Sequence, residues 1–228
     1  MIALSNDQQR EITTLAARYS TPRYVEVELA EGSFEPLSSR ARVSEVCMVI
    51  RRQNQQILVF RKDFYPSGVL RLLTGGIEAG EQIETALLRE VAEETGLDVH
   101  IERFLAVVAY RMPSTALGHN DFLTFAFLLQ ERGGTLMAHD PHERVECFAD
   151  VAPAALYELA AVLDRQDDTI DDAIDGSWQL WGALSRRDPS YCRRSTYRKP
   201  LTARLHAVTI PMKLRNDAAW SSGSSSGS

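Results

Sequence analysis

The stretch that decides the fold is GGIEAGEQIETALLREVAEETGL, which runs from Gly75 to Leu97. Its second half, residues 81–95, has the apolar spacing of a helix. Yet Glu90, Glu93 and Glu94 crowd the last two turns, although the C-terminal end of a helix already carries partial negative charge. Glu90 also faces the other two at i,i+3 and i,i+4 spacing, where like charges repel. The sequence therefore poses the question of what compensates for this arrangement.

The three glutamates share one flank of the predicted helix. At 100° per residue they fall within an arc of roughly 100°, whereas Leu87, Leu88 and Val91 occupy a different sector that can pack on a sheet. Oxygen ligands gathered in this way suit a hard divalent cation such as Mg²⁺ or Mn²⁺, which would cancel the repulsion. The alternative is an acidic helix face turned to solvent, and the glutamates alone do not exclude it.

The spacing of the surrounding residues favours the metal site. The stretch follows G-x5-E-x7-R-E-U-x-E-E-x-G-U, where U is aliphatic, and its seven fixed identities arise by chance about 10⁻⁸ times per starting position. This pattern is the Nudix box, and the chain resembles the Nudix hydrolase superfamily over about residues 42–165. The matching positions are Gly75, Glu81, Arg89, Glu90, Val91, Glu93, Glu94, Gly96 and Leu97.

The resemblance implies both a fold and a chemistry. The expected fold class is α+β, an α/β/α sandwich in which helices flank a mixed β-sheet. The expected activity is that of a Nudix-type pyrophosphohydrolase, which uses Mg²⁺ or Mn²⁺ to hydrolyse the pyrophosphate bond of a nucleoside diphosphate derivative. ADP-ribose or another nucleotide sugar is the first substrate expected, and nucleoside triphosphates, dinucleoside polyphosphates and capped RNA ends stay open. Family members are often dimers, so the resemblance also implies a homodimer.

The family pattern assigns roles within the box. Glu90, Glu93 and Glu94 match metal ligands, and Arg89 matches the arginine that orients a glutamate. The supporting positions, one acidic and two where the backbone approaches metal and pyrophosphate closely, are Glu81, Gly75 and Gly76.

A carboxylate must also accept the proton of the attacking water. Glu93 is the first candidate for this catalytic base. The alternative is an acidic residue on the later loop HDPHERVE, where Glu143 comes first and Glu146 second. A plain loop charge is the competing interpretation of Glu143.

Two residues outside the box are predicted to contact substrate. Pro113 lies 16 residues beyond Leu97, which resembles the downstream proline of ADP-ribose pyrophosphatases. Arg61 lies close before the box and suits a phosphate group, as do the neighbouring basic residues Arg51, Arg52 and Lys62. Solvent-facing hairpin charges are the alternative for these four residues.

Apolar periodicity places the remaining elements. An N-terminal helix and strand, residues 1–41, pack on or precede the core, and a Nudix domain with C-terminal helices spans residues 42–185. A basic segment (186–220) and a linker-like end (221–228) follow. The expected strands cover 23–29, 44–52, 55–62, 69–74, 99–111, 121–132 and 144–151, and the helices cover 6–19, 81–95, 153–165 and 170–186.

Composition bounds the remaining possibilities. No apolar run approaches the roughly 18 residues of a membrane span, no signal peptide is evident, and three widely spaced cysteines fit a reducing compartment, so a cytoplasmic protein without a membrane partner is expected. The net charge is −6, but from Arg186 onward nine basic residues face two acidic ones. A non-catalytic nucleotide sensor or an RNA-associated Nudix protein that uses this tail is therefore the alternative function. The complete box argues against it, and nucleic acid is not expected as a partner.

Overall fold

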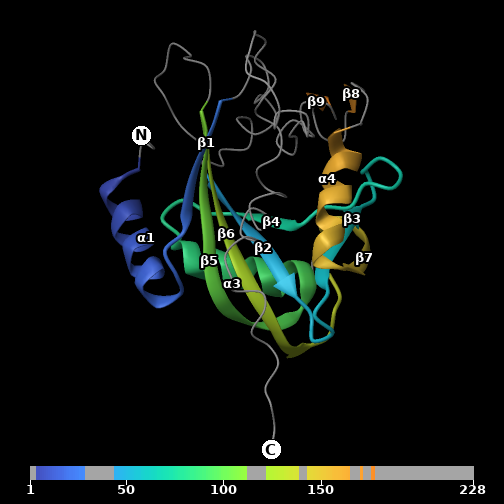
Figure 1. The fold of residues 1–228 in the computed structure, drawn as a ribbon, viewed down its shortest axis with the longest axis horizontal. Helices are drawn as coiled ribbons and strands as arrows, with labels where there is room; N and C mark the ends of the chain where they lie inside the picture. The colour runs from blue at the N-terminus through green and yellow to red at the C-terminus, as the bar shows by residue number, and fades with distance from the viewer. Residues whose placement is uncertain are drawn as a thin grey trace, which may run out of the picture.

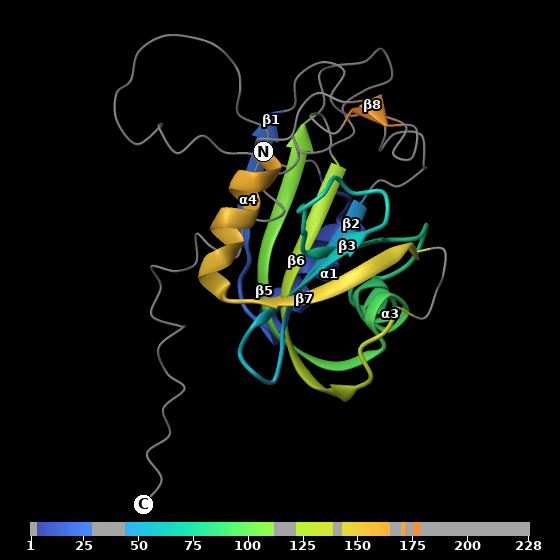
Figure 2. The same cartoon turned by 90° about the vertical axis from the view of Figure 1, so that its right-hand side faces the viewer.

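The computed structural model describes residues 4–28, 44–111, 122–138, 143–164, 170–171 and 176–177. Most of these residues build a mixed β-sheet with helices on both of its faces (Figures 1 and 2). This is the α+β arrangement predicted from the sequence. No helix in this part of the chain is long and apolar enough to cross a membrane.

Seven strands form the large sheet, in the order β1-β5-β6-β2-β3-β7, and β4 pairs with β2 off this path. Two neighbouring pairs, β1–β5 and β2–β6, are parallel, and the other pairs are antiparallel. The parallel β2–β6 pair lies at the centre of the sheet, and β4, which contains the first two residues of the Nudix box, pairs with β2. The strands are β1 (Arg23–Glu28), β2 (Ser44–Arg51), β3 (Ile57–Lys62), β4 (Leu73–Gly76), β5 (Leu97–Arg111), β6 (Phe122–Gly134) and β7 (Val145–Val151).

Helices α1 (Asn6–Arg18) and α3 (Ile83–Thr95) cover one face of the sheet, and α4 (Leu156–Asp164) covers the other. In Figure 2, α3 and α4 lie on opposite sides of the strands. Ser5 begins α1 with a capping box, in which its hydroxyl and the Gln8 side chain each bond the other's backbone N–H. A short 3-10 turn, η2 (Pro153–Ala155), leads into α4, and Gly96 ends α3 in the left-handed conformation (φ 62°).

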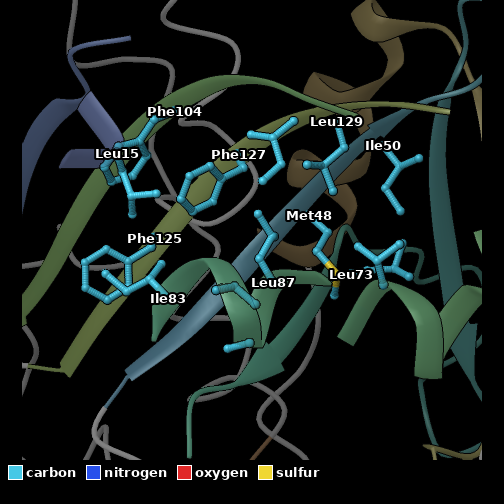
Figure 3. Close-up of a cluster of buried hydrophobic side chains, with 14 of the residues drawn as sticks. Leu15, Met48, Ile50, Leu73, Ile83, Leu87, Phe104, Phe125, Phe127 and Leu129 are labelled. Carbon is cyan, nitrogen blue, oxygen red and sulfur yellow. The ribbon is translucent and has the colours of Figure 1, made fainter. Parts of the chain in front are cut away.

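The larger hydrophobic cluster lies between the sheet and helices α1 and α3 (Figure 3). Leu15 of α1 and Leu87 of α3 enter it, together with Phe104 and Phe127, whose rings stack with centroids 4.5 Å apart. Burial of one such leucine contributes about 1.5–3 kcal/mol. The apolar sector of α3 is therefore fixed on the sheet, which directs its acidic sector away from the core.

Helix α1 also stabilises the start of α3 through polar contacts. Gln82, the N-cap of α3, makes no side-chain cap bond. Instead, the Glu11 carboxylate of α1 accepts a hydrogen bond from the Ile83 backbone N–H. Arg18 binds both carboxylate oxygens of Glu84 in the first turn of α3. A residue far away in the sequence therefore supplies the cap that α3 lacks.

The C-terminal part of the prediction was wrong where the structure describes it. A helix was predicted over 170–186, but two-residue strands β8 (Ile170–Asp171) and β9 (Gly176–Ser177) pair there instead. The strand predicted at 69–74 lies at 73–76, because backbone pairing with β2 continues through the two box glycines. The basic segment 186–220 and the end 221–228 lie outside the described residues.

Candidate active site

Arg89 is the centre of the candidate site. Its guanidinium has five N–H groups, and each of them has an acceptor. Nε and Nη2 bind the two carboxylate oxygens of Glu81 at 2.9 Å, and Nη2 also donates to the Gly76 carbonyl at 2.9 Å. Nη1 donates to Glu90 and to Glu93, each at 3.0 Å. One arginine thus ties the box loop to two of the three glutamates of α3.

This network explains part of how the repulsion among the glutamates of α3 is compensated. Arg89 sits one residue before Glu90 and four before Glu93, so its positive charge lies within the repelling group. Its hydrogen bonds hold the pKa of the Glu81 carboxyl below its usual range. The carboxylates of Glu81, Glu90 and Glu93 are therefore fixed in place by a single planar cation, which is the geometry in which arginine surpasses lysine.

The first of the two box glycines, Gly75, makes room for Glu90. The Glu90 side chain is 5% exposed and passes so close to the Gly75 backbone that a Cβ built on Gly75 overlaps its carboxyl group. Gly75 and Gly76 lie in β4, paired with Val46 and Glu45 of β2. Gly75 is therefore required by its contact with a site carboxylate rather than by an unusual backbone angle.

Replacing Gly75 by alanine is expected to damage the site selectively. The added methyl group must displace the Glu90 carboxyl, and a shift of about 1 Å at a reacting centre costs roughly 100-fold in rate. Overpacking should also lower the free energy of unfolding by about 1–3 kcal/mol. Steady-state hydrolysis and thermal unfolding measure the two effects. Gly133→Ala is the control, because a Cβ there meets only an ordinary 3.8 Å contact with Asp98; equal effects in both variants would contradict this role of Gly75.

Glu94 lies in a second cluster with Lys62 and Glu143. It is 1% exposed, and its Oε1 lies 3.6 Å from the Lys62 ammonium, which donates to Glu143 at 2.6 Å. Its other oxygen, Oε2, is buried without a hydrogen-bond partner. An unpaired buried carboxylate oxygen is costly, so this atom is an unused acceptor that a bound cation would satisfy.

Burial raises the pKa of Glu94 well above the usual glutamate value of 4.5, and the nearby Glu143 carboxylate raises it further, whereas Lys62 opposes the shift. Burial alone would lower the pKa of Lys62, but the charges of Glu94 and Glu143 raise it above the ordinary lysine value. The lysine is therefore charged at neutral pH, between two carboxylates.

The raised pKa predicts how pH acts on the metal-free protein. The folded state binds the Glu94 proton more tightly than the unfolded state does, so stability falls as pH rises from about 4.5 toward the folded-state pKa. Glutamine cannot ionise. Glu94→Gln should therefore gain unfolding free energy relative to wild type between pH 5 and pH 8, measured by urea unfolding in a chelator. A difference between the two proteins that stays constant over this range would contradict the shift.

The loop that carries Glu143 is fixed by its neighbour. Arg144 adopts a positive φ of 54°, its side chain pairs with Asp63 at 2.9 Å, and its backbone carbonyl accepts a hydrogen bond from the Asp63 N–H. The Arg144 guanidinium also lies 4.9 Å from the centre of the Phe64 ring. These contacts attach the loop to the segment after β3 and present Glu143 to Glu94.

The structure separates Lys62 from the other basic residues considered for phosphate. Arg61 pairs with both oxygens of Glu146, so neither of these two residues contacts the carboxylate helix. Arg51 pairs with Glu102, and Arg52 pairs with Glu131 and Asp150. Lys62 alone among the four bonds to residues of the candidate site. Arg61 stays a prediction as a substrate contact, and Pro113 lies outside the described residues.

The donor set fits a hard divalent cation. Glu81, Glu90, Glu93, Glu94 and Glu143 bring five carboxylates against two cations, a formal charge of −3 when all are ionised. All the ligand atoms are oxygens, which Mg²⁺ and Mn²⁺ prefer. In the described part of the chain no three acidic, imidazole or thiol groups converge on one point as a preformed metal site.

A family model described as NUDIX domain matches residues 41–172, more than half of the chain. The chain therefore belongs to the NUDIX domain family, and the family predicted from the box residues is confirmed.

Named relatives show the range of the family that is similar to this chain. An ADP-ribose pyrophosphatase from Methanocaldococcus jannaschii is 35% identical over 101 residues, 44% of this chain and 57% of the relative. The NAD-capped RNA hydrolase NudC of Photobacterium profundum is 34% identical over 124 residues, 54% of this chain and 42% of that protein. The chain thus spans about half the length of these relatives. A NUDIX hydrolase structure from Nitrosomonas europaea is 24% identical, with a TM-score of 0.38 over 53% of this chain and 78% of that one.

Proposed function

We propose that this protein hydrolyses the pyrophosphate bond of a nucleoside diphosphate derivative, with Mg²⁺ or Mn²⁺ bound by Glu90, Glu93 and Glu94. The observation that carries the proposal is the buried, unpartnered Oε2 of Glu94 within a cluster of five carboxylates and two cations. A folded domain does not keep such a charge imbalance cheaply. A cation that binds there relieves it, and the same cation attracts a pyrophosphate.

The residues of the site have distinct tasks in this proposal. When bound, the cation neutralises charge on the phosphoryl oxygens and activates the attacking water. Glu93 is the most exposed of the three helix carboxylates, with 48% of its side chain accessible, so it can reach a water molecule and accept its proton. Arg89 keeps Glu90 and Glu93 oriented, and Gly75 leaves space for Glu90.

Glu143 is the second candidate for the base. It approaches Glu94 from the loop before β7 and bonds to Lys62, whereas Glu146 of β7 pairs with Arg61 of the neighbouring strand β3. The geometry therefore favours Glu143 over Glu146, as the order of candidates from the sequence does.

ADP-ribose is the first proposed substrate, because the relative from Methanocaldococcus jannaschii is named an ADP-ribose pyrophosphatase. A 5′-terminal NAD on RNA is the second, because several similar proteins are named NAD-capped RNA hydrolases. Both contain a pyrophosphate attached to adenosine. The chain would therefore bind nucleic acid only if its substrate is the NAD-capped end of an RNA.

A product-resolved screen tests the proposal. The full chain is incubated with ADP-ribose, UDP-glucose, NAD, NAD-capped RNA, diadenosine polyphosphates and nucleoside triphosphates, with Mg²⁺, with Mn²⁺ and with a chelator. The expected result is a nucleoside monophosphate from at least one diphosphate-linked compound, and no product in the chelator. Absence of metal-dependent product from every compound, or turnover in the chelator, would remove the proposal; nucleotide binding without turnover would favour the sensor alternative.

A further inference from the structure

We infer that Lys62 is an internal counter-cation of the metal site: its ammonium neutralises Glu94 and Glu143 in the metal-free protein and competes with the divalent cation for them. The inference rests on the proposed function, because it concerns the affinity of the same site for its metal. The Nudix box does not contain Lys62, which is the last residue of β3 and lies thirteen residues before Gly75, where the box begins.

The first support is where the ammonium lies. Its Nζ is 2.6 Å from Glu143 and 3.6 Å from Glu94, and the Lys62 side chain is only 16% exposed. The Phe60 ring, 5.5 Å from Nζ, covers it from the same strand. A buried lysine whose nearest acceptors are two acidic groups occupies the kind of position that a bound cation takes.

The second support is the contact between Glu94 and Lys62, which is too long for a hydrogen bond. Oε2 of Glu94 has no partner, and its Oε1 has the Lys62 ammonium 3.6 Å away. This separation lies within the range of an ion pair but beyond that of a hydrogen bond. Lys62 therefore compensates the charge of Glu94 while leaving its oxygens available to a ligand that binds them directly.

The third support is electrostatic. A positive charge that lies beside the carboxylates that hold a divalent cation repels that cation. Lys62 must therefore weaken metal binding at Glu94, while it stabilises the protein before metal binds. A lysine with a purely structural role would stabilise the metal-free protein without weakening metal binding.

Strand geometry explains why Lys62 has this position and Arg61 does not. Side chains alternate along a strand, and Phe60 belongs to the hydrophobic cluster that contains α3, whereas Val59 belongs to the cluster on the α4 face. Lys62 continues the Phe60 row. Arg61 follows the Val59 row and pairs with Glu146 of β7. The chain thus provides two adjacent basic residues, of which one serves as a matched control.

The test is a calorimetric titration of Mn²⁺ into the full-length, chelator-treated protein. Lys62→Met removes the charge and keeps the apolar stem, and it should tighten Mn²⁺ binding at least about 5-fold. Lys62→Arg keeps the charge and should stay within about 3-fold of wild type. Arg61→Met removes an equal charge from the exposed ion pair and should leave Mn²⁺ affinity unchanged.

Thermal unfolding supplies a second readout. Without metal, Lys62→Met should unfold at a lower temperature than wild type, because Glu94 and Glu143 lose their counter-charge; saturating Mn²⁺ should remove most of the difference. If the Lys62→Met variant does not fold, Lys62→Gln is measured in its place. If both variants fold only with Mn²⁺, the inference is supported, and if neither folds even with Mn²⁺, a purely structural lysine is shown and the inference is overturned.

The outcomes separate the two proposals. If wild type binds no Mn²⁺, the proposed function fails and the inference fails with it. If wild type binds Mn²⁺ and Glu94→Gln weakens that binding, but Lys62→Met binds no more tightly than wild type, only the role of Lys62 is overturned.

Discussion

Glu93→Gln and Glu94→Gln are each expected to lower kcat/KM at least about 100-fold, because each change removes a proposed metal ligand or the base while it keeps the shape of the side chain. The two variants should differ in a second property. Glu94 is buried beside Lys62, so its loss should weaken Mn²⁺ binding measured by calorimetry, whereas Glu93 is half exposed and its loss should act more on turnover than on metal affinity.

The matched control for both is Glu84→Gln. Glu84 lies on the same helix, but it bonds to Arg18 and Tyr19 of the N-terminal segment. Its hydrolysis rate should stay within about 3-fold of wild type. Wild-type rates in both Glu93→Gln and Glu94→Gln, on whichever compound the screen identifies, would show that the acidic flank of α3 is not the catalytic site.

Arg89→Met should produce the largest combined loss of activity and stability. The substitution removes five hydrogen bonds, four that hold Glu81, Glu90 and Glu93 and one to the Gly76 carbonyl. Three carboxylates then repel one another, so the free energy of unfolding should fall by about 2–4 kcal/mol, and kcat/KM should fall at least about 100-fold. Denaturant unfolding and steady-state kinetics measure these effects.

Two variants test whether geometry or charge matters at position 89. Arg89→Lys keeps the charge but cannot make the two-pronged contact with Glu81, so it should recover stability only in part. Arg18→Met breaks a similar two-oxygen contact with Glu84, but that pair is exposed, so it should cost less than about 1 kcal/mol. Equal losses in Arg89→Met and Arg18→Met would contradict the central place given to Arg89.

The sequence predicted the carboxylate helix and its arginine well, because the box residues are close in the chain and their contacts follow from helical spacing. Arg89 and Glu93 are four residues apart, which places them side by side on a helix. Gly75 and Gly76 were also predicted to support the site. The sequence could not show that Gly75 leaves space for Glu90, because that contact depends on the pairing of β4 with β2, which brings Gly75 against α3.

The sequence grouped Lys62 with Arg61 and two other arginines as possible phosphate contacts, and it did not assign Lys62 to the carboxylate cluster. Strand β3 is apolar on both faces, as Ile57, Leu58, Val59 and Phe60 show, so its pattern does not tell which residues point toward α3. Only the position of α3 relative to the sheet shows which residues of β3 point toward that helix. The cap that Glu11 provides is equally long-range, because it joins residues 72 positions apart.

The contacts of α1 and β1 have a practical consequence for anyone who trims the chain. The family model begins at residue 41, so a fragment cut to that boundary would lose Glu11, Arg18 and the whole of β1. It would leave the long strand β5 with an open row of backbone donors and acceptors, a surface that invites self-association. Preparations for crystallography or kinetics should therefore retain the first 28 residues, even though they lie outside the region that defines the family.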